Sequence, residues 1–206
     1  LEFRRVLFRS DGLYAFVEQS ADGSKVRVIG SVADVLVAAE ERDRLIAALA
    51  NPATHIVSFT ITEKGYCRAP DGSLDFTQAG EKSAYAYLAA ALRQRRAAKL
   101  GGLTLLSCDN LAGNGAQLAV LMRAYLEGCA PDLVHWFEDQ CSCPSTMIDR
   151  IVPATTDSDR VSIAAILGGV DQAAVVTEPF TQWVIEDHFA SKRPCWDVGG
   201  AQFTKD

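Results

Sequence analysis

Residues 103–115, with the sequence LTLLSCDNLAGNG, constrain the fold more than any other part of the chain. The apolar run 103–106 follows a double glycine and suits a strand that is buried on both faces. The sequence then becomes polar at once, and an amphipathic segment opens at Asn114 and continues to about Cys129. Strand, polar loop and helix in this order are typical of an open α/β sheet, whose ligands bind beyond the carboxyl ends of the strands.

The polar residues of this loop admit two interpretations. An amide and a carboxylate at the end of a buried strand can orient a small polar substrate. Alternatively, Asp109, Asn110 and Asn114 only cap the following helix and make the turn. The loop residues by themselves favour this structural alternative.

The rest of the chain alternates strands and helices. A turn signal at residues 21–24 lies between two β-rich runs and predicts a hairpin. Further strands are expected at 55–62, 146–152, 175–177, 182–186 and 201–204, and helices within 31–51 and at 81–100, 132–140 and 157–168. Asp157 can cap the last of these helices. The alternation through residues 56–152 predicts an α/β fold, with a mostly parallel sheet and helices on both faces.

Two clusters of polar residues have structural explanations. Four basic residues near the end of the 81–100 helix suit the negative end of a helix dipole, and we expect them to be solvated: Arg93, Arg95, Arg96 and Lys99. The segment 135–143, HWFEDQCSC, places His135 and Glu138 three residues apart but matches no zinc signature. We therefore expect no metal site, and interpret this segment as surface residues beside reduced thiols.

Composition excludes several classes of protein. The net charge of −6 provides no basic field for nucleic acid or an anionic membrane. No apolar run approaches the length of a membrane span, and no secretory signal is visible. The six cysteines form no CxxC pair, which favours reduced thiols in a soluble, cytoplasmic protein.

The beginning of the chain differs from the remainder. Residues 1–10, LEFRRVLFRS, have no cap and no clear period, and we interpret them as a non-native leader. No GxGxxG motif follows an opening strand, so these residues alone do not assign a dinucleotide site.

Four ordered sequence blocks make the interpretation specific: TITEKGYC at 60–67, SCDNLAGNG at 107–115, CPSTMIDRIVPATT at 143–156 and VVTEPFTQWVIEDHF at 175–189. In this order and spacing they resemble the mannitol dehydrogenase family of polyol-specific long-chain dehydrogenases. The first, third and fourth blocks are most similar to the fructuronate reductase (D-mannonate oxidoreductase) branch of that family.

The resemblance implies a Rossmann-like domain followed by a helical domain, with the active site between them. It implies that residues 11–206 are a partial NAD(P)-binding domain, truncated at its N-terminal βαβ unit. The glycine fingerprint is expected before Asp11, and the catalytic lysine, asparagine and histidine after Asp206. This chain by itself is therefore expected to be inactive, and the full enzyme to be a monomer.

The activity that the resemblance implies is a metal-independent hydride transfer between NAD or NADP, with NAD favoured, and a small sugar substrate. The reaction is of the fructuronate-to-mannonate type. A mannitol or other polyol 2-dehydrogenase is an alternative within the family. An α/β binding module without chemistry is the alternative from another class.

The resemblance also assigns roles to individual residues. Asn110 corresponds to the family's active-site asparagine, which lies at the cofactor. The amide of that asparagine donates a hydrogen bond to the reacting oxygen of the substrate, and a fixed donor there stabilises the negative charge that develops on this oxygen. Asp149 falls on a substrate-contacting aspartate. A carboxylate midway along an apolar strand needs a partner if it is buried, and either a sugar hydroxyl or Arg150 can provide one.

Three further residues complete the predicted site. Glu63 resembles a substrate-binding glutamate at the mouth of the active site, with helix or turn capping as the alternative. Thr60 and Thr62 are expected to line the cofactor cleft, although β-propensity also explains two threonines in a strand. An aromatic group is expected to serve interdomain or core packing rather than to form a carbohydrate platform: Phe180, Trp183, Phe189 and Trp196.

Overall fold

The computed structural model describes residues 12–205, which divide into two compact units. The first, here called the hairpin unit, lies within Leu1–Leu36 and Asp149–Thr181. The second, here called the central unit, lies within Val37–Ile148 and Gln182–Asp206. The predicted leader at residues 1–10 falls outside the described residues.

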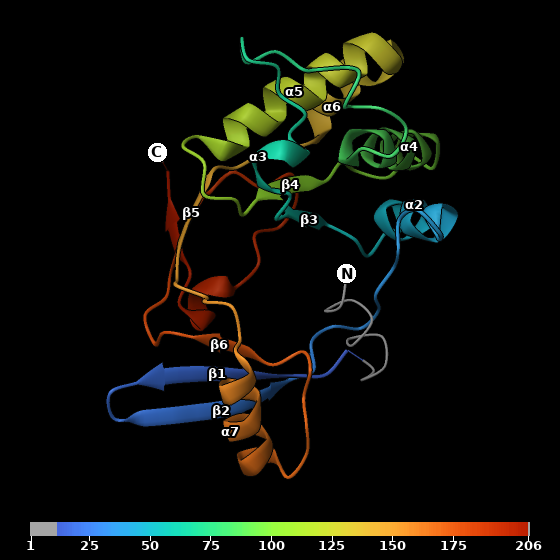
Figure 1. The fold of residues 1–206 in the computed structure, drawn as a ribbon. Helices are drawn as coiled ribbons and strands as arrows, with labels where there is room; N and C mark the ends of the chain where they lie inside the picture. Colours follow the sequence, from blue (N-terminus) through green and yellow to red (C-terminus); the bar gives the residue numbers. More distant parts are fainter. Residues whose placement is uncertain (1–11, 206) are drawn as a thin grey trace. The chain divides into compact units, whose positions relative to one another are not determined.

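The hairpin unit is a three-stranded sheet covered by one helix (Figure 1). Strands β1 (Tyr14–Ser20) and β2 (Gly23–Ile29) pair antiparallel, so the predicted hairpin is confirmed. Strand β6 (Val175–Thr177) runs parallel to β1, and α7 (Asp157–Leu167) packs Ile163 against the sheet. The unit therefore has a small apolar core of its own, formed by Ala15, Val17, Ile163, Ala174 and Val176.

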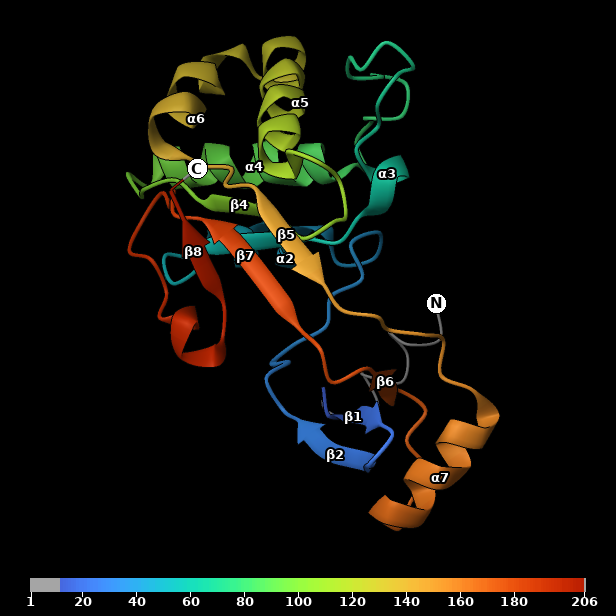
Figure 2. The ribbon, with the colours of Figure 1, turned by 90° about the vertical axis from the view of Figure 1, so that its left-hand side faces the viewer.

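The central unit contains two further sheets (Figure 2). Strands β3 (Ile56–Phe59) and β4 (Thr104–Ser107) pair in parallel, and a parallel bridge from Thr104 to Ser142 extends this sheet by one short segment. Strands β5 (Thr146–Asp149), β7 (Gln182–Glu186) and β8 (Gln202–Thr204) form the other sheet in that order, with β7 and β8 parallel.

The helices of the central unit pack on one another and on β4. They are α2 (Arg42–Ala50), α3 (Thr62–Gly65), α4 (Ala84–Ala97), α5 (Asn114–Cys129) and α6 (Val134–Gln140), with short 3-10 turns η1 (Pro131–Leu133) and η2 (Trp196–Gly199). Helix α2 contacts α4, and α5 contacts β4. None of the described helices has the length and apolar character needed to span a membrane.

The strand predicted from the 103–106 run is confirmed. Leu103, Leu105 and Leu106 are each 0% exposed, as a strand covered on both faces requires. The main core of the central unit forms around this strand from α4 and α5, with Leu92 and Met122 also fully buried. The helix predicted from Asn114 to Cys129 is confirmed with the same bounds.

Two predicted strands are shorter than the sequence indicates. The 55–62 strand ends at Phe59, because the N–H groups of Ile61 and Thr62 bind a side chain instead of a neighbouring strand. The 146–152 strand ends at Asp149, because the backbone of Ile151 pairs with Glu178 through both its N–H and its C=O.

Two predictions about helix ends are also wrong. Thr156, rather than Asp157, is the N-cap of α7: its hydroxyl accepts from the N–H of Asp159, whose carboxylate binds the Thr156 N–H in return. Arg95 is not a solvated helix end but is 2% exposed. Its guanidinium donates to backbone carbonyls that end α2 and precede β4: Leu49, Asn51, Thr54, Gly101 and Gly102.

Candidate active site

The candidate site lies at the carboxyl ends of β3 and β4. The two parallel strands end together, since Phe59 pairs with Ser107 and the N–H of Cys108 donates to the Phe59 carbonyl. The chain then runs through Asn110 to the start of α5 at Asn114. This is the edge at which open α/β sheets bind ligands.

Asp109 joins the loop after β4 to the turn after β3. Its Oδ2 accepts from the Ile61 N–H at 3.1 Å and its Oδ1 from the Thr62 N–H at 3.0 Å. The Tyr66 hydroxyl lies 3.1 Å from Oδ2 and 2.5 Å from the hydroxyl of Ser107. Burial, with a smaller contribution from the Asp109 charge, raises the pKa of Tyr66 to about 12. Asp109 is therefore a structural clamp.

This clamp holds an uncommon backbone conformation. Thr62 has φ 59°, in the left-handed region that β-branched residues rarely adopt. Such conformations persist only where neighbouring contacts enforce them, and here the Asp109 carboxylate accepts both adjacent N–H groups. The turn that carries Glu63 is thereby fixed to the loop that carries Asn110.

Asn110 is exposed, and its side chain forms no hydrogen bond with any other described residue. The sequence left capping as an alternative role for this residue. The N-cap of α5 is instead Gly113, in the left-handed conformation and without a side-chain cap. The Asn110 amide is therefore available to a ligand.

The three residues predicted after β3 lie outside the strand. Thr60 follows β3 directly, while Thr62 and Glu63 belong to the four-residue helix α3. All three are exposed, so strand propensity does not account for the two threonines. Glu63 lines a shallow depression of about 360 Å³ together with Lys64 and Arg68.

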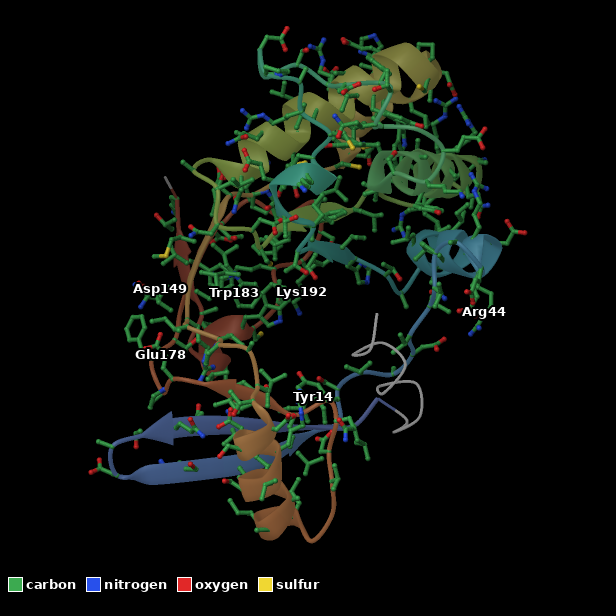
Figure 3. The ribbon with its side chains drawn as sticks, in the orientation of Figure 1. Tyr14, Arg44, Asp149, Glu178, Trp183 and Lys192 are labelled. Atoms are coloured by element: carbon green, nitrogen blue, oxygen red, sulfur yellow. The ribbon has the colours of Figure 1, made fainter. Side chains whose placement is uncertain are left out.

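Asp149 is the last residue of β5, labelled in Figure 3, and it is exposed. The prediction of a carboxylate midway along a strand is therefore wrong. Arg150 is occupied elsewhere: its Nη2 lies 3.0 Å from the Glu18 carboxylate, and its guanidinium lies 4.8 Å from the Phe16 ring centre. Asp149 belongs to the hairpin unit, whereas Thr60, Thr62, Glu63 and Asn110 belong to the central unit.

Asn114 and Thr146 are the residues near the site whose roles sequence reasoning missed. Asn114, expected to cap α5, is 0% exposed and bonds across to Thr146 at the start of β5. The only signal in the sequence was an Asn-Gly pair at the start of a helix, which capping explained equally well.

The 135–143 segment and the aromatic group are the remaining candidate clusters. His135 lies 3.5 Å from Glu138, whose carboxylate also binds Arg123 at 2.7 Å, and residues 12–205 contain no group of three potential metal ligands. Trp183 stacks on Trp196 with ring centres 4.9 Å apart, and Phe189 contacts Trp196 and Phe203 edge to face. Phe180 is 52% exposed and belongs to the hairpin unit, so it is not part of this cluster.

Comparison with known proteins identifies the family. A family model described as the mannitol dehydrogenase Rossmann domain matches residues 2–198. The chain belongs to the mannitol dehydrogenase family. Both the resemblance carried by the four sequence blocks and the predicted Rossmann-like α/β fold are thereby confirmed.

Relatives within the mannitol dehydrogenase family include two kinds of enzyme. Mannitol 2-dehydrogenase of Aspergillus terreus is 39% identical, over 98% of this chain and 43% of its own length. D-mannonate oxidoreductase of Escherichia coli is 40% identical, over 94% of this chain and 42% of its own length. The chain thus spans less than half the length of these relatives.

Two solved structures of dehydrogenases share the fold. Substrate-free D-sorbitol dehydrogenase superposes with a TM-score of 0.93 at 33% identity, over 100% of this chain and 45% of that one. Mannitol 2-dehydrogenase of Pseudomonas fluorescens, in a complex with NAD and D-mannitol, gives a TM-score of 0.90 at 38% identity, over 98% of this chain and 44% of that one.

Proposed function

We propose that this chain is the NAD-binding part of a dehydrogenase that transfers a hydride between the cofactor and a sugar acid or a polyol. The observation that carries the proposal is the placement of Asn110. Its amide, which has no hydrogen-bond partner among the described residues, lies beyond the carboxyl end of β4, beside a turn that Asp109 holds in place. Relatives named as mannitol 2-dehydrogenase and D-mannonate oxidoreductase support the reaction class.

The donors at the two strand ends fit a dinucleotide. The Thr60 and Thr62 hydroxyls and the Asn110 amide are exposed and uncharged, and such groups bind ribose hydroxyls and the nicotinamide amide. NAD is favoured over NADP by the relative that was solved with NAD. When bound, this cofactor would supply the hydride as NADH in the reducing direction and accept it as NAD in the oxidising direction.

The residues of this chain act on the substrate. A carbonyl that receives a hydride develops negative charge on its oxygen, and the Asn110 amide donates a hydrogen bond to that oxygen. Asp149 accepts a hydrogen bond from a substrate hydroxyl, because its carboxylate is exposed and has no partner within residues 12–205. Glu63 is the second residue to which the family resemblance assigns a contact with the substrate.

The substrate belongs to one of two classes. Reduction of fructuronate to mannonate is the reaction indicated by the first, third and fourth sequence blocks, and a D-mannonate oxidoreductase is 40% identical. Oxidation of mannitol at C2 is the second candidate, favoured by a mannitol 2-dehydrogenase that is 39% identical. The cytoplasmic location and the monomeric state expected for the full enzyme remain predictions.

The test uses the full-length protein that contains this chain. We would follow oxidation of NADH and NADPH with fructuronate, tagaturonate and fructose. Turnover with a keto-uronate supports the reductase reaction, and turnover with fructose alone supports the polyol reaction. A folded protein that binds neither nucleotide contradicts the proposal and leaves the non-catalytic α/β module.

A variant tests the role of Asn110 directly. Asn110→Ala is expected to lower kcat by about 10²–10³-fold, the usual cost of removing a donor to a developing oxyanion. The matched control is Gln140→Ala, which removes an exposed amide at the end of α6. Equal turnover by the two variants would remove Asn110 from the site.

A further inference from the structure

Asn114 occupies an unusual position for a polar side chain. It is the first residue of α5 and is 0% exposed. Its Nδ2 donates to the carbonyl of Asp109 at 2.9 Å and to the carbonyl of Thr146 at 3.0 Å. One buried amide therefore holds the residue before Asn110 and the first residue of β5.

Thr146 reinforces the same connection from the other side. Its N–H donates to the Asn114 Oδ1 at 2.9 Å, so the two residues exchange hydrogen bonds in both directions. Its hydroxyl donates to the carbonyl of Ser107 at 2.6 Å. The start of β5 is thus bonded to the loop after β4 at both Ser107 and Asp109.

The packing at Gly115 is an independent sign of this close contact. A Cβ placed on Gly115 would lie 2.4 Å from the carbonyl oxygen of Cys143 and 2.4 Å from the carbonyl carbon of Pro144. Only glycine allows the first turn of α5 to approach the 143–146 segment so closely. Two adjacent residues, one by hydrogen bonds and one by its missing side chain, fix α5 to the start of β5.

We propose that Asn114 is a positioning residue that holds the Asn110 loop in register with β5. This inference rests on the proposed function, because the role of Asn114 is to hold Asn110 and the strand that ends in Asp149 in position for the substrate. Asn114 itself cannot touch the substrate, since it is fully buried and both atoms of its amide are bonded within the protein.

The test variant is Asn114→Asp, which keeps the size of the side chain and an acceptor for the Thr146 N–H but replaces the donor Nδ2 with oxygen. Thr146→Val is the second variant, because it removes the bond to Ser107 and leaves the backbone bonds intact. Leu126→Ala is the matched control: it weakens the same helix from a fully buried position far from the loop.

In the full-length enzyme, Asn114→Asp is expected to lower kcat by about 10- to 100-fold, the range that small misplacements of reacting groups produce. The KM for NADH should rise by a smaller factor than kcat falls, because the displaced loop carries only some of the proposed cofactor contacts. In an Asn110→Ala background, Asn114→Asp should lower kcat by less than about twofold, because a positioning residue cannot act through an amide that has been removed. Equal costs in both backgrounds would overturn the proposal.

Hydrogen exchange on this chain gives a readout that does not depend on activity. Asn114→Asp is expected to accelerate exchange of the Ile61 and Thr62 amides, which Asp109 holds, and Leu126→Ala is not. Unchanged exchange at both amides would overturn the proposal even if the enzyme is inactive. If the full-length protein has no turnover, or if Asn110→Ala does not change its turnover, the proposed function is contradicted. The hydrogen-exchange result then decides whether Asn114 positions the loop.

Discussion

The Asp109 carboxylate holds Thr62 in the left-handed region of the backbone: Oδ1 accepts from the Thr62 N–H at 3.0 Å, and φ of Thr62 is 59°. The two residues are 47 positions apart in the sequence. A carboxylate is well suited to this task, because its two oxygens accept several N–H groups at once. The turn that carries Glu63 thus depends on a side chain from the neighbouring strand end.

We expect Asp109→Asn to destabilise the chain by about 1 kcal/mol, the usual net contribution of a hydrogen bond, because Asp109 and Ile61 are only partly buried and Thr62 is exposed. An amide offers one acceptor oxygen, and its NH2 group would face either the Ile61 or the Thr62 N–H. Urea unfolding measures the change. The control is Asp139→Asn at an exposed site, expected to stay within about 0.5 kcal/mol. A shift no larger than that of the control would show that the clamp is not needed for stability.

The contrast between β4 and the turn after β3 shows which parts of the fold could be predicted from the sequence. The apolar run that became β4 and the periodic segment that became α5 are local patterns, and local patterns predicted them correctly. The strand predicted through residue 62 failed because a distant carboxylate competes for its amides. Strand propensity does not register a partner that arrives through the tertiary fold.

Arg95 gives a stability prediction with a neighbouring control. Arg95→Met removes a buried side chain that donates to five backbone carbonyls, and we expect a loss of about 3 kcal/mol or more. Arg96→Met removes an exposed ion pair with Asp132 and should cost less than about 1 kcal/mol. Thermal unfolding of both variants tests this ordering, and similar losses would contradict it.

The difference between Arg95 and Arg96 shows why the candidate site could be predicted only in part from the sequence. Arg95 and Arg96 are adjacent and chemically identical, yet one is 2% exposed and the other forms a surface ion pair. Asn110 and Asn114 differ in the same way, since one is exposed and the other fully buried. Residue type gave the chemistry in each pair, but burial was decided by segments that are distant in the sequence.

The cysteines are expected to differ in reactivity toward an alkylating reagent. Burial raises the pKa of Cys108 and of Cys141 to about 11 and that of Cys143 to about 12, so few of these thiols are ionised near neutral pH. Cys129 and Cys195 are exposed. Iodoacetamide labelling followed by mass spectrometry at pH 8 should modify the two exposed cysteines first. Early modification of Cys108 would mean that the loop after β4 opens in solution.

Tyr66 predicts how stability depends on alkaline pH. Its phenol has a pKa of about 12 in the folded chain, against an ordinary value of 10.0, so the folded state binds its proton more tightly than the unfolded state. The resulting stabilisation is fully present below pH 10 and is lost as the pH rises toward 12. Tyr66→Phe keeps the ring and removes this dependence.

The measurement is the urea midpoint of both proteins from pH 9 to pH 12. The difference between wild type and Tyr66→Phe isolates Tyr66, because the other buried phenols, Tyr85, Tyr87 and Tyr125, are present in both proteins. We expect this difference to shrink as the pH rises through that range. A constant difference would indicate that the phenol titrates alike in both states, and therefore that Tyr66 is not buried in solution as it is in this structure.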